Sequence, residues 1–265
     1  MMPLPPHSFI QKTHLFEPIS LAEMGAVQLM NRKDKKFLVP IAFLSPLLED
    51  LRTHYRILEI DGNRFSEYKT LYFDTPTLQM YHAHQSGRMN RYKIRQRHYV
   101  HTDTVFTEVK FKNNKGRTIK SRIQQNTLPG QLDTEGVADF LTQISPFQTA
   151  DLQPVLWVNY TRLTFVDLVN GERLTLDLDL SFHTEQFHKH YGKVVVAEIK
   201  QDALKNSYFE TLMKHYHLRE GAMSKYCLGV VSLYPDTKQN RFKRKLSHLH
   251  KIIAHHDTAP KPQQP

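Results

Sequence analysis

The segment Asn90–Tyr99 has the sequence NRYKIRQRHY, in which a cation recurs at every second position: Arg91, Lys93, Arg95 and Arg97. A β-strand turns successive side chains to opposite faces, so these four cations would share one face of a strand, whereas a helix would spread them around its circumference. Like charges on neighbouring positions of one face repel each other unless something neutralises them. The segment therefore predicts a β-strand whose cationic face binds an anion.

The bulk composition agrees with an anionic partner. The chain has 265 residues and a formal net charge of +10, which favours nucleic acid, anionic membranes or phosphate compounds. Its single cysteine, Cys227, excludes an internal disulfide and indicates a reducing compartment. Residues 1–6 lack the features of a signal peptide, and no apolar run is long enough to span a bilayer. We expect a soluble, cytoplasmic protein.

Other segments alternate with the same period of two. The clearest is Arg173–Leu180, RLTLDLDL, which sets Arg173, Thr175, Asp177 and Asp179 against four leucines. Further strands are predicted at 31–40, 56–60, 69–73, 105–112, 117–123, 155–166 and 193–200. Amphipathic spacing predicts helices at 20–31, 41–55, 131–144, 201–218 and 224–234, and a basic helix in the tail.

Charged and apolar faces on the same strands, with helices between them, predict a sheet curled around its charged face and covered by helices outside. Closing such a sheet would remove its exposed edges. Unpaired charges cannot be buried in a dry core, so the lumen would hold water and a multivalent anion. Alternation alone is equally compatible with an α+β sheet whose charged faces are simply solvated.

A set of motifs in a fixed order favours the first of these two folds. The segments are RKDKKFLV (32–39), LYFDTP (71–76), NRYKIRQRHY (90–99), TEVKFKNNKGRTIKSRI (107–123), NYTRLTF (159–165), RLTLDLDL (173–180), VVVAEIK (194–200) and SKYCLGV (224–230). Together they resemble the VTC-type polyphosphate polymerase domain of the triphosphate tunnel metalloenzyme, or CYTH-like, superfamily. The resemblance implies an α+β fold with a closed antiparallel β-barrel tunnel of about eight strands, a charged lumen and surrounding helices.

The resemblance also implies roles for individual residues. The phosphate-binding cations at the catalytic centre would be Lys36, Arg95, Arg97, Lys110, Arg162, Arg173, Lys200 and Lys225. Secondary phosphate contacts would come from Arg91, Lys93, Lys112 and Arg122. Glu198 would hold the metal ion, with Glu108 and Asp177 as helpers. The family has glutamate in its first strand at the position of Asp34, which is one methylene shorter.

The implied activity is a metal-dependent ATP–polyphosphate phosphotransferase, which moves the γ-phosphate of ATP onto a growing polyphosphate chain. Mn²⁺ or Mg²⁺ would be the cofactor, and ATP and inorganic polyphosphate or triphosphate the partners. Two alternatives stay open: a hydrolase of the same fold that cleaves tripolyphosphate or a nucleoside triphosphate, and a non-catalytic polyphosphate-binding module. The sequence leaves open the oligomeric state and a membrane-protein partner that handles the product.

Several other site classes are disfavoured. The chain has no GxxxxGK[ST] motif, so we expect no P-loop nucleotide site. RNA-binding proteins use exposed aromatic platforms, but Tyr92 and Phe111 fall on the predicted apolar faces, so no nucleic acid is expected. The histidines show no spacing typical of a zinc site.

The predicted organisation has three parts. Residues 1–19 form a flexible lead-in, residues 20–235 the tunnel domain, and residues 236–265 a basic helix with a disordered tail. Eukaryotic members of the family also carry a phosphate-sensing regulatory domain and a membrane domain, for which this sequence has no counterpart.

Overall fold

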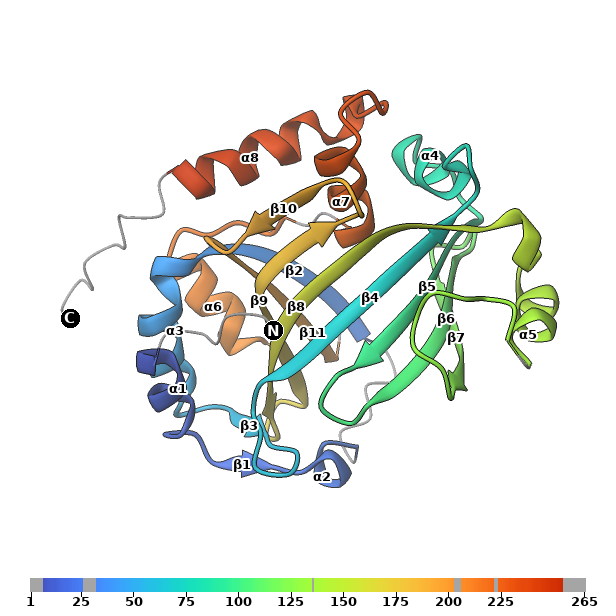
Figure 1. Cartoon of the computed structure of the whole chain (residues 1–265). Helices are drawn as coiled ribbons and strands as arrows, with labels where there is room; N and C mark the ends of the chain where they lie inside the picture. Colours follow the sequence, from blue (N-terminus) through green and yellow to red (C-terminus); the bar gives the residue numbers. More distant parts are fainter. Residues whose placement is uncertain (1–6, 26–31, 135, 203–205, 222–223, 255–265) are drawn as a thin grey trace.

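The computed structural model describes residues 7–25, 32–134, 136–202, 206–221 and 224–254, and one large sheet dominates it (Figure 1). Hydrogen bonds connect eight strands in the order β2-β11-β9-β8-β4-β5-β6-β7, with every neighbouring pair antiparallel. These strands are β2 (Arg32–Pro40), β4 (Ser66–Asp74), β5 (Arg91–Tyr99), β6 (Thr104–Lys112), β7 (Thr118–Gln125), β8 (Gln153–Asp167), β9 (Glu172–His183) and β11 (Val194–Asp202).

Three short strands join this path at its margins. Strand β3 pairs with β8 and β1, and β10 pairs with β9. They span Pro18–Ile19 (β1), Arg56–Leu58 (β3) and His188–Tyr191 (β10). The described helices are α1 (His7–Thr13), α2 (Leu21–Gly25), α3 (Leu44–Leu51), α4 (Gln79–Gln85), α5 (Val137–Ile144), α6 (Tyr208–His215), α7 (Lys225–Leu233) and α8 (Lys243–Ala254). None of these helices is long and apolar enough to cross a membrane.

Helices cover the convex side of the sheet because that side carries the apolar residues. Leucines of α3 and Phe209 of α6 pack with Val195, Ala197 and Ile199 of β11 in one core cluster. On the other half of the sheet, α5 packs on β5 and β6 around Ile94 and Val109. The charged residues of the same strands consequently face the concave side. The period of two therefore predicted correctly which face of β5, β6 and β11 carries the residues that pack under α3, α5 and α6.

The sheet does not close, which corrects the predicted barrel. Strands β2 and β7 are the two ends of the hydrogen-bonded path, and no pairing joins them within the described residues. The free edge of β2 is instead occupied by another segment: Gly221 N donates to Lys36 O at 2.9 Å, and Phe37 forms a bridge with Glu220. Because these backbone groups are already satisfied, β2 cannot also pair with β7 along this stretch. The fold is an α+β fold with a curved, open antiparallel sheet.

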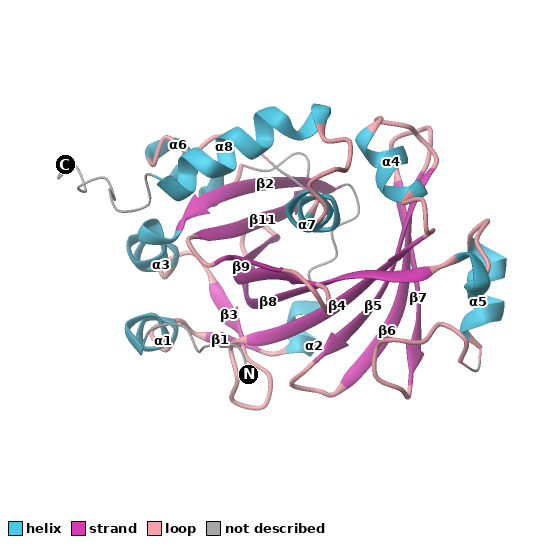
Figure 2. Cartoon of the chain, turned by 45° about the horizontal axis from the view of Figure 1, so that its top comes forward, coloured by secondary structure: helices cyan, strands magenta, loops and turns pink. Residues whose placement is uncertain are grey.

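Helix α7 lies inside the curve of the sheet (Figure 2). A change of face in β9 makes room for it. Leu174, Leu176 and Leu178 pack on the convex side, but Asp179 has a φ of +55°, and Leu180 then packs with α7. The predicted alternation therefore breaks at Asp179. Helix α7 covers one end of the concave side and brings its own N-terminus to the middle.

Serine side chains cap the starts of two helices. Ser20 and Glu23 form the capping box of α2, with Ser20 N donating to Glu23 Oε2 at 2.9 Å and Glu23 N to Ser20 Oγ at 3.3 Å. Ser224 caps α7 by accepting a hydrogen bond from Cys227 N at 3.4 Å. The rest of the helix predicted at 20–31 lies outside the described residues.

Candidate functional site

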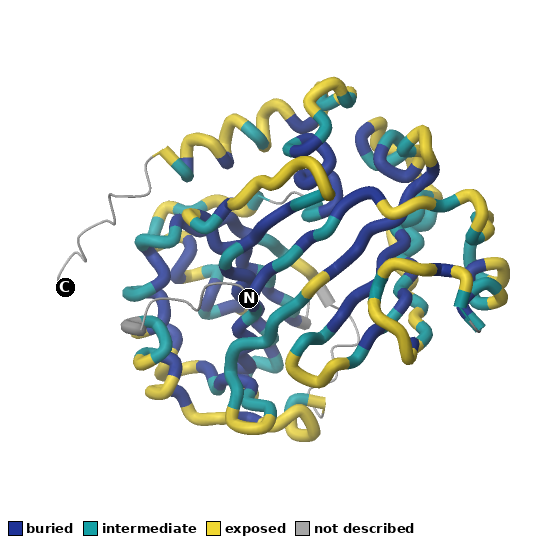
Figure 3. The backbone as a smooth tube through the Cα atoms, viewed as in Figure 1, coloured by how far each residue is buried: buried dark blue, intermediate teal, exposed yellow. Residues whose placement is uncertain are grey.

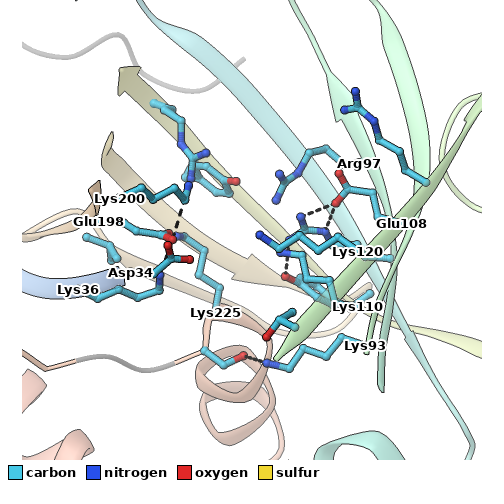
Figure 4. A pocket seen from close by; sticks show the side chains of 18 of the residues that line it. Asp34, Lys36, Lys93, Arg97, Glu108, Lys110, Lys120, Glu198, Lys200 and Lys225 are labelled. Carbon is cyan, nitrogen blue, oxygen red and sulfur yellow. Dashed lines mark hydrogen bonds and ion pairs between the residues drawn. The ribbon is translucent and has the colours of Figure 1, made fainter. Parts of the chain in front are cut away.

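The concave side of the sheet holds a cavity of about 610 Å³ (Figure 4). Its lining is mainly charged and comes from all parts of the sheet and from the start of α7. Ten cations line it: Lys36, Lys93, Arg95, Arg97, Lys110, Lys120, Arg122, Arg162, Lys200 and Lys225. The lining carboxylates are Asp34, Glu108 and Glu198. Such an excess of positive charge in a partly buried space favours a multivalent anion.

Strand β5 contributes Lys93, Arg95 and Arg97 from one face, as its alternation predicted. The antiparallel register sets Arg95 opposite Glu108 of β6, and these two side chains form an ion pair. Burial alone would raise the pKa of Glu108, but Arg95 and its neighbouring cations outweigh that and lower it to about 2. Arg95 also donates to Tyr72 Oη at 3.1 Å. Its guanidinium is therefore held in place from two sides.

The same register places lysines opposite lysines. Lys93 of β5 faces Lys110 of β6, and Lys110 faces Lys120 of β7. Burial lowers the pKa of Lys110 well below its usual value, and the charges of Arg95 and Arg97 lower it further. Burial also lowers the pKa of Lys93, whose Nζ donates to Ser224 Oγ at 2.8 Å. Three lysines in a row across three strands repel each other and would be stabilised by an anion.

The opposite wall is formed by β2 and β11. Their register pairs Glu198 with Lys36 and Lys200 with Asp34. Glu198 Oε1 lies 2.7 Å from Lys36 Nζ and 3.6 Å from Lys200 Nζ. Burial would raise the pKa of Glu198, but Lys200 and Lys36 hold it well below its usual range. Burial lowers the pKa of Lys200 to about 8, against the attraction of Glu198.

Between the two walls, Asp177 neutralises two of the cations. Arg162 Nε and Nη2 donate to Asp177 Oδ1 and Oδ2 at 2.6 and 2.9 Å, and Lys225 Nζ donates to Oδ2 at 2.5 Å. Asp177 is fully buried; burial would raise its pKa, but Arg162 and Lys225 hold it well below its usual range. Both oxygens of this carboxylate are therefore engaged by cations, and Asp177 lies behind the lining.

Two tyrosines complete the lining and position the arginines. The Arg162 guanidinium lies 5.3 Å from the ring centre of Tyr160, and the Lys225 ammonium lies 4.7 Å from it. Arg95 lies 5.9 Å from the ring centre of Tyr72. Cation–π contacts of this kind restrain side chains that would otherwise be mobile.

The structure brings together most of the residues that the sequence predicted for the site. Lining the cavity are Lys36, Lys93, Arg95, Arg97, Lys110, Arg122, Arg162, Lys200, Lys225, Glu108 and Glu198. Three predicted cations lie outside the lining: Arg91, Lys112 and Arg173. Arg91 lines a separate hollow next to α4 and donates to Arg88 O at 2.7 Å. Lys112 is opposite Arg91 at the same end of the sheet, and Arg173 Nη2 donates to Met24 O at 3.4 Å.

Four residues that line the cavity had no predicted role: Lys120, Tyr72, Tyr160 and Ser224. Lys120 could have been found, because it shares the period-two face of β7 with Arg122. The tyrosines carry no comparable signal, since aromatic residues in strands are usually core residues. Ser224 reaches the cavity only because α7 packs inside the sheet.

The carboxylates suit a metal ion that arrives with its substrate. The described residues contain no group of three or more histidine, cysteine or acidic side chains placed to hold a metal ion together. Mg²⁺ is commonly bound by one or two carboxylates together with substrate phosphates and water. Glu198 fits this pattern, because it lines the cavity and has hard oxygen ligands. Glu108 also lines the cavity, and both carboxylates are paired with cations: Glu108 with Arg95, and Glu198 with Lys36 and Lys200.

The chain is similar to known proteins in its sequence profile and in its structure. The profile of a family described as VTC domain matches residues 31–234. A solved structure of a candidate adenylate cyclase from Vibrio parahaemolyticus has a TM-score of 0.44 and 14% identity, covering 76% of this chain and 99% of its own. A candidate adenylyl cyclase from Hippeastrum, described as having a dominant triphosphatase activity, has a TM-score of 0.49 and 13% identity, covering 77% and 97%.

The RNA triphosphatase Pct1 of S. pombe has a TM-score of 0.28 and 9% identity, covering 97% of this chain and 90% of its own. Among curated proteins, no sequence matches this chain.

Proposed function

Because this chain belongs to the VTC domain family, we propose that it is a polyphosphate polymerase that transfers the γ-phosphate of ATP onto a polyphosphate chain in the cationic cavity. The observation that carries the proposal is the lining of ten cations against three carboxylates around about 610 Å³. Phosphoryl transfer needs little covalent chemistry from a protein, but it needs charge neutralisation and in-line positioning. The cationic lining supplies the charge neutralisation that the proposal requires.

The reaction balances without a proton. A terminal phosphate oxygen of the chain attacks the γ-phosphorus of ATP, and the bond from that phosphorus to the β–γ bridging oxygen breaks. ADP leaves with the bonding electron pair, and the polyphosphate chain is one phosphate longer. The nucleophile is already anionic, so the protein does not have to supply a base.

Arginines and lysines have different tasks in this scheme. Arg95, Arg97 and Arg162 offer planar guanidinium groups for bidentate contacts with non-bridging phosphate oxygens. Arg95 and Arg162 are each held by a carboxylate and a tyrosine, so they are oriented before the substrate binds. The row Lys93, Lys110 and Lys120 supplies point charges along the phosphate chain.

A divalent cation, Mn²⁺ or Mg²⁺, would be held by Glu198 together with substrate phosphates. When bound, it would withdraw charge from the phosphate oxygens and stabilise the diphosphate leaving group. Lys36 and Lys200 flank Glu198 and would contact the same phosphates. The cytoplasmic location that the sequence predicts is part of this proposal.

Hydrolysis of a triphosphate is the second candidate function, and one observation favours it. Water must lose a proton to attack phosphorus, so a hydrolase needs a base. Glu108 is a lining carboxylate that would take this proton, because Arg95 and its neighbouring cations lower its pKa to about 2 and keep it ionised. Glu108→Gln keeps the volume and removes the base. It would abolish hydrolysis and leave polymerisation largely intact.

The deciding experiment incubates the purified chain with ATP and Mn²⁺ and separates long-chain polyphosphate, ADP and orthophosphate. A polyphosphate ladder with matching ADP supports the polymerase. Orthophosphate without a ladder, abolished in Glu108→Gln, would replace the polymerase with the hydrolase. Intact ATP, together with tight tripolyphosphate binding, would leave only a binding module.

A further inference from the structure

Helix α8 is cationic and lies outside the cavity. Its sequence is KRKLSHLHKIIA, and residues 237–254 contain no aspartate or glutamate. Its apolar side is used by the fold itself: Leu249 and Ile252 are 1% and 8% exposed and pack with Phe242, Tyr226 and neighbouring residues in one core cluster. The helix is therefore fixed on the body of the protein, and its polar side faces solvent (Figure 3).

The exposed side carries a compact group of cations. Lys243, Arg244, His248 and Lys251 line one surface hollow together with Ser247. Successive residues in this group are one or three positions apart, which places them on one face of the helix. All five are exposed, and none of the four basic residues forms an ion pair with a described residue. Like charges at this spacing repel each other, so an anion would stabilise the face.

Through His248, this face lies next to Gly221, which is hydrogen-bonded to the backbone of a residue that lines the cavity. Helix α8 lies along β2 (Figures 1 and 2), and the ring of His248 is next to Gly221, with Cδ2 4.0 Å from where a Cβ of Gly221 would lie. Gly221 N donates to the carbonyl oxygen of Lys36 at 2.9 Å, and the Lys36 side chain lines the cavity. Ser224, three positions after Gly221, and Lys225 lie at the start of α7 and also line the cavity.

Three polyanions could be attracted to such a face, and the contacts favour one. An amphipathic helix binds a membrane by inserting its apolar side, but the apolar side of α8 is buried in the protein core. Single-stranded RNA is held partly by base stacking on aromatic rings, and the exposed face Lys243, Arg244, Ser247, His248 and Lys251 has no phenylalanine, tyrosine or tryptophan. Inorganic polyphosphate needs only cations, and a growing chain must leave a cavity of limited volume.

We propose that the basic face of α8, formed by Lys243, Arg244, His248 and Lys251, is a second binding surface for inorganic polyphosphate, which holds the part of a long chain that extends beyond the cavity. The identity of the polyanion rests on the proposed function. In this proposal tripolyphosphate is short enough to be held within the cavity, whereas a long chain contacts both the cavity and the basic face of α8. The basic face therefore contributes only to the binding of long chains.

The test compares two triple variants of the full chain. Lys243→Gln/Arg244→Gln/Lys251→Gln removes the charge of the α8 face. The control, Arg52→Gln/Lys69→Gln/Lys115→Gln, removes three exposed cations that lie after α3, on β4 and in the β6–β7 turn. The two triple variants therefore have the same net charge. Affinities for fluorescent long-chain polyphosphate and for tripolyphosphate are measured at several salt concentrations.

We expect the α8 variant to bind long-chain polyphosphate roughly tenfold more weakly and with a shallower salt dependence, since three exposed charge contacts are lost. Its tripolyphosphate affinity and the control's affinities stay unchanged. Equal weakening in both variants, or none in either, would overturn the proposal.

Two further measurements separate the other polyanions. Loss of binding to phosphatidylserine vesicles or to homopolymeric RNA in the α8 variant, with long-chain polyphosphate binding intact, would also overturn the proposal. If the wild-type chain binds long-chain polyphosphate through α8 but makes none from ATP, the proposed function fails and the surface remains.

Discussion

Glu198 lies between Lys36 and Lys200, so its carboxylate can neutralise a cation or bind a metal ion that accompanies the substrate. The two roles have different consequences for binding and for catalysis. An isosteric amide removes the negative charge and keeps the volume, so it distinguishes them.

We expect Glu198→Gln to lower turnover of ATP with Mn²⁺ by about hundredfold, because polarisation by a metal ion is worth several kcal/mol. Tripolyphosphate binding should be retained or become tighter, because Lys36 loses its anionic partner. Steady-state turnover and calorimetric binding measure the two effects. Glu185→Gln, which makes the same substitution at an exposed glutamate, is the matched control. Wild-type turnover in Glu198→Gln would show that the metal is held elsewhere.

Lys200 links binding to pH. Burial lowers its pKa to about 8 in the folded protein, so its ammonium loses its proton as the pH rises through that value. A bound polyanion favours the protonated form and raises this pKa, so binding takes up a proton above pH 8. The affinity for tripolyphosphate should therefore fall with rising pH, by up to about tenfold per pH unit from this group.

The pH dependence is measured by calorimetry from pH 7 to 10. Lys200→Arg keeps its charge across this range, so its affinity should fall less steeply, with the remainder coming from Lys93 and Lys110. Lys69→Arg, which changes an exposed lysine of β4, should behave like the wild type. A Lys200→Arg profile identical to that of the wild type would exclude Lys200 as the source.

At the scale of the elements, strand register determines which charges meet. Arg95 pairs with Glu108 because β5 and β6 place them directly opposite each other, and Lys93 meets Lys110 for the same reason. Shifting one strand by two residues would keep every cation on the concave face and exchange all the partners. Register therefore decides which cations are neutralised within the protein and which remain for the substrate.

Helix α7 is held in the sheet by a buried contact. Tyr226 Oη donates to Asp74 Oδ2 at 2.5 Å, and the same carboxylate accepts hydrogen bonds from Met80 N and Tyr81 N at the start of α4. The Tyr226 ring also stacks on Tyr72, which lines the cavity. One buried aspartate thereby ties α4 to α7 and supports the helix that brings Ser224 into the cavity.

Tyr226→Phe should lower the free energy of unfolding by about 1.5–3 kcal/mol, as expected for a lost hydrogen bond to a charged acceptor. Tyr234→Phe is the matched control, because Tyr234 Oη donates at 2.8 Å to a neutral acceptor, the carbonyl oxygen of Val155. It should cost about 0.5–1.5 kcal/mol. Urea denaturation followed by circular dichroism measures both values. Equal losses would mean that the charge of Asp74 does not strengthen the contact.

At the scale of the whole molecule, the net charge of +10 is concentrated in part around one cavity. Mutual repulsion among these cations destabilises the folded chain, and a bound polyanion relieves it. The stability of the protein should therefore depend on phosphate compounds more than that of a protein with dispersed charge.

Tripolyphosphate at about a hundred times its dissociation constant should stabilise the fold by roughly 2.7 kcal/mol, which corresponds to roughly 5–10 °C in melting temperature. Differential scanning fluorimetry measures the shift, and orthophosphate at equal ionic strength should give a much smaller one. The shift should decrease as salt is raised, because other anions compete for the cations. Equal shifts with the two phosphates would show that the cavity does not select a chain of phosphates.

Alternation with a period of two and ordered motifs are local properties of the chain, so the eight long strands, most of their charged faces and the family could be predicted from the sequence. It also predicted Arg95, Lys110, Arg162 and Glu198 as neighbours, since residues on one face of a curved sheet converge. The sequence also predicted Arg91 in this group. A residue's position along the strand decides whether its side chain reaches the cavity, and Arg91, the first residue of β5, lies beside α4 instead.

Whether the sheet closes could not be predicted from the sequence. Gly221 occupies the edge of β2, and a contact between residues 185 positions apart leaves no periodic signal in the sequence. The same is true of α7, whose place inside the sheet follows from the left-handed backbone at Asp179 and from the buried contact of Tyr226 with Asp74. The face that a strand residue occupies follows from local backbone geometry. The pairing of a sheet edge and the place of α7 inside the sheet depend on contacts between distant segments, and a short stretch of sequence does not reveal the free energy of such contacts.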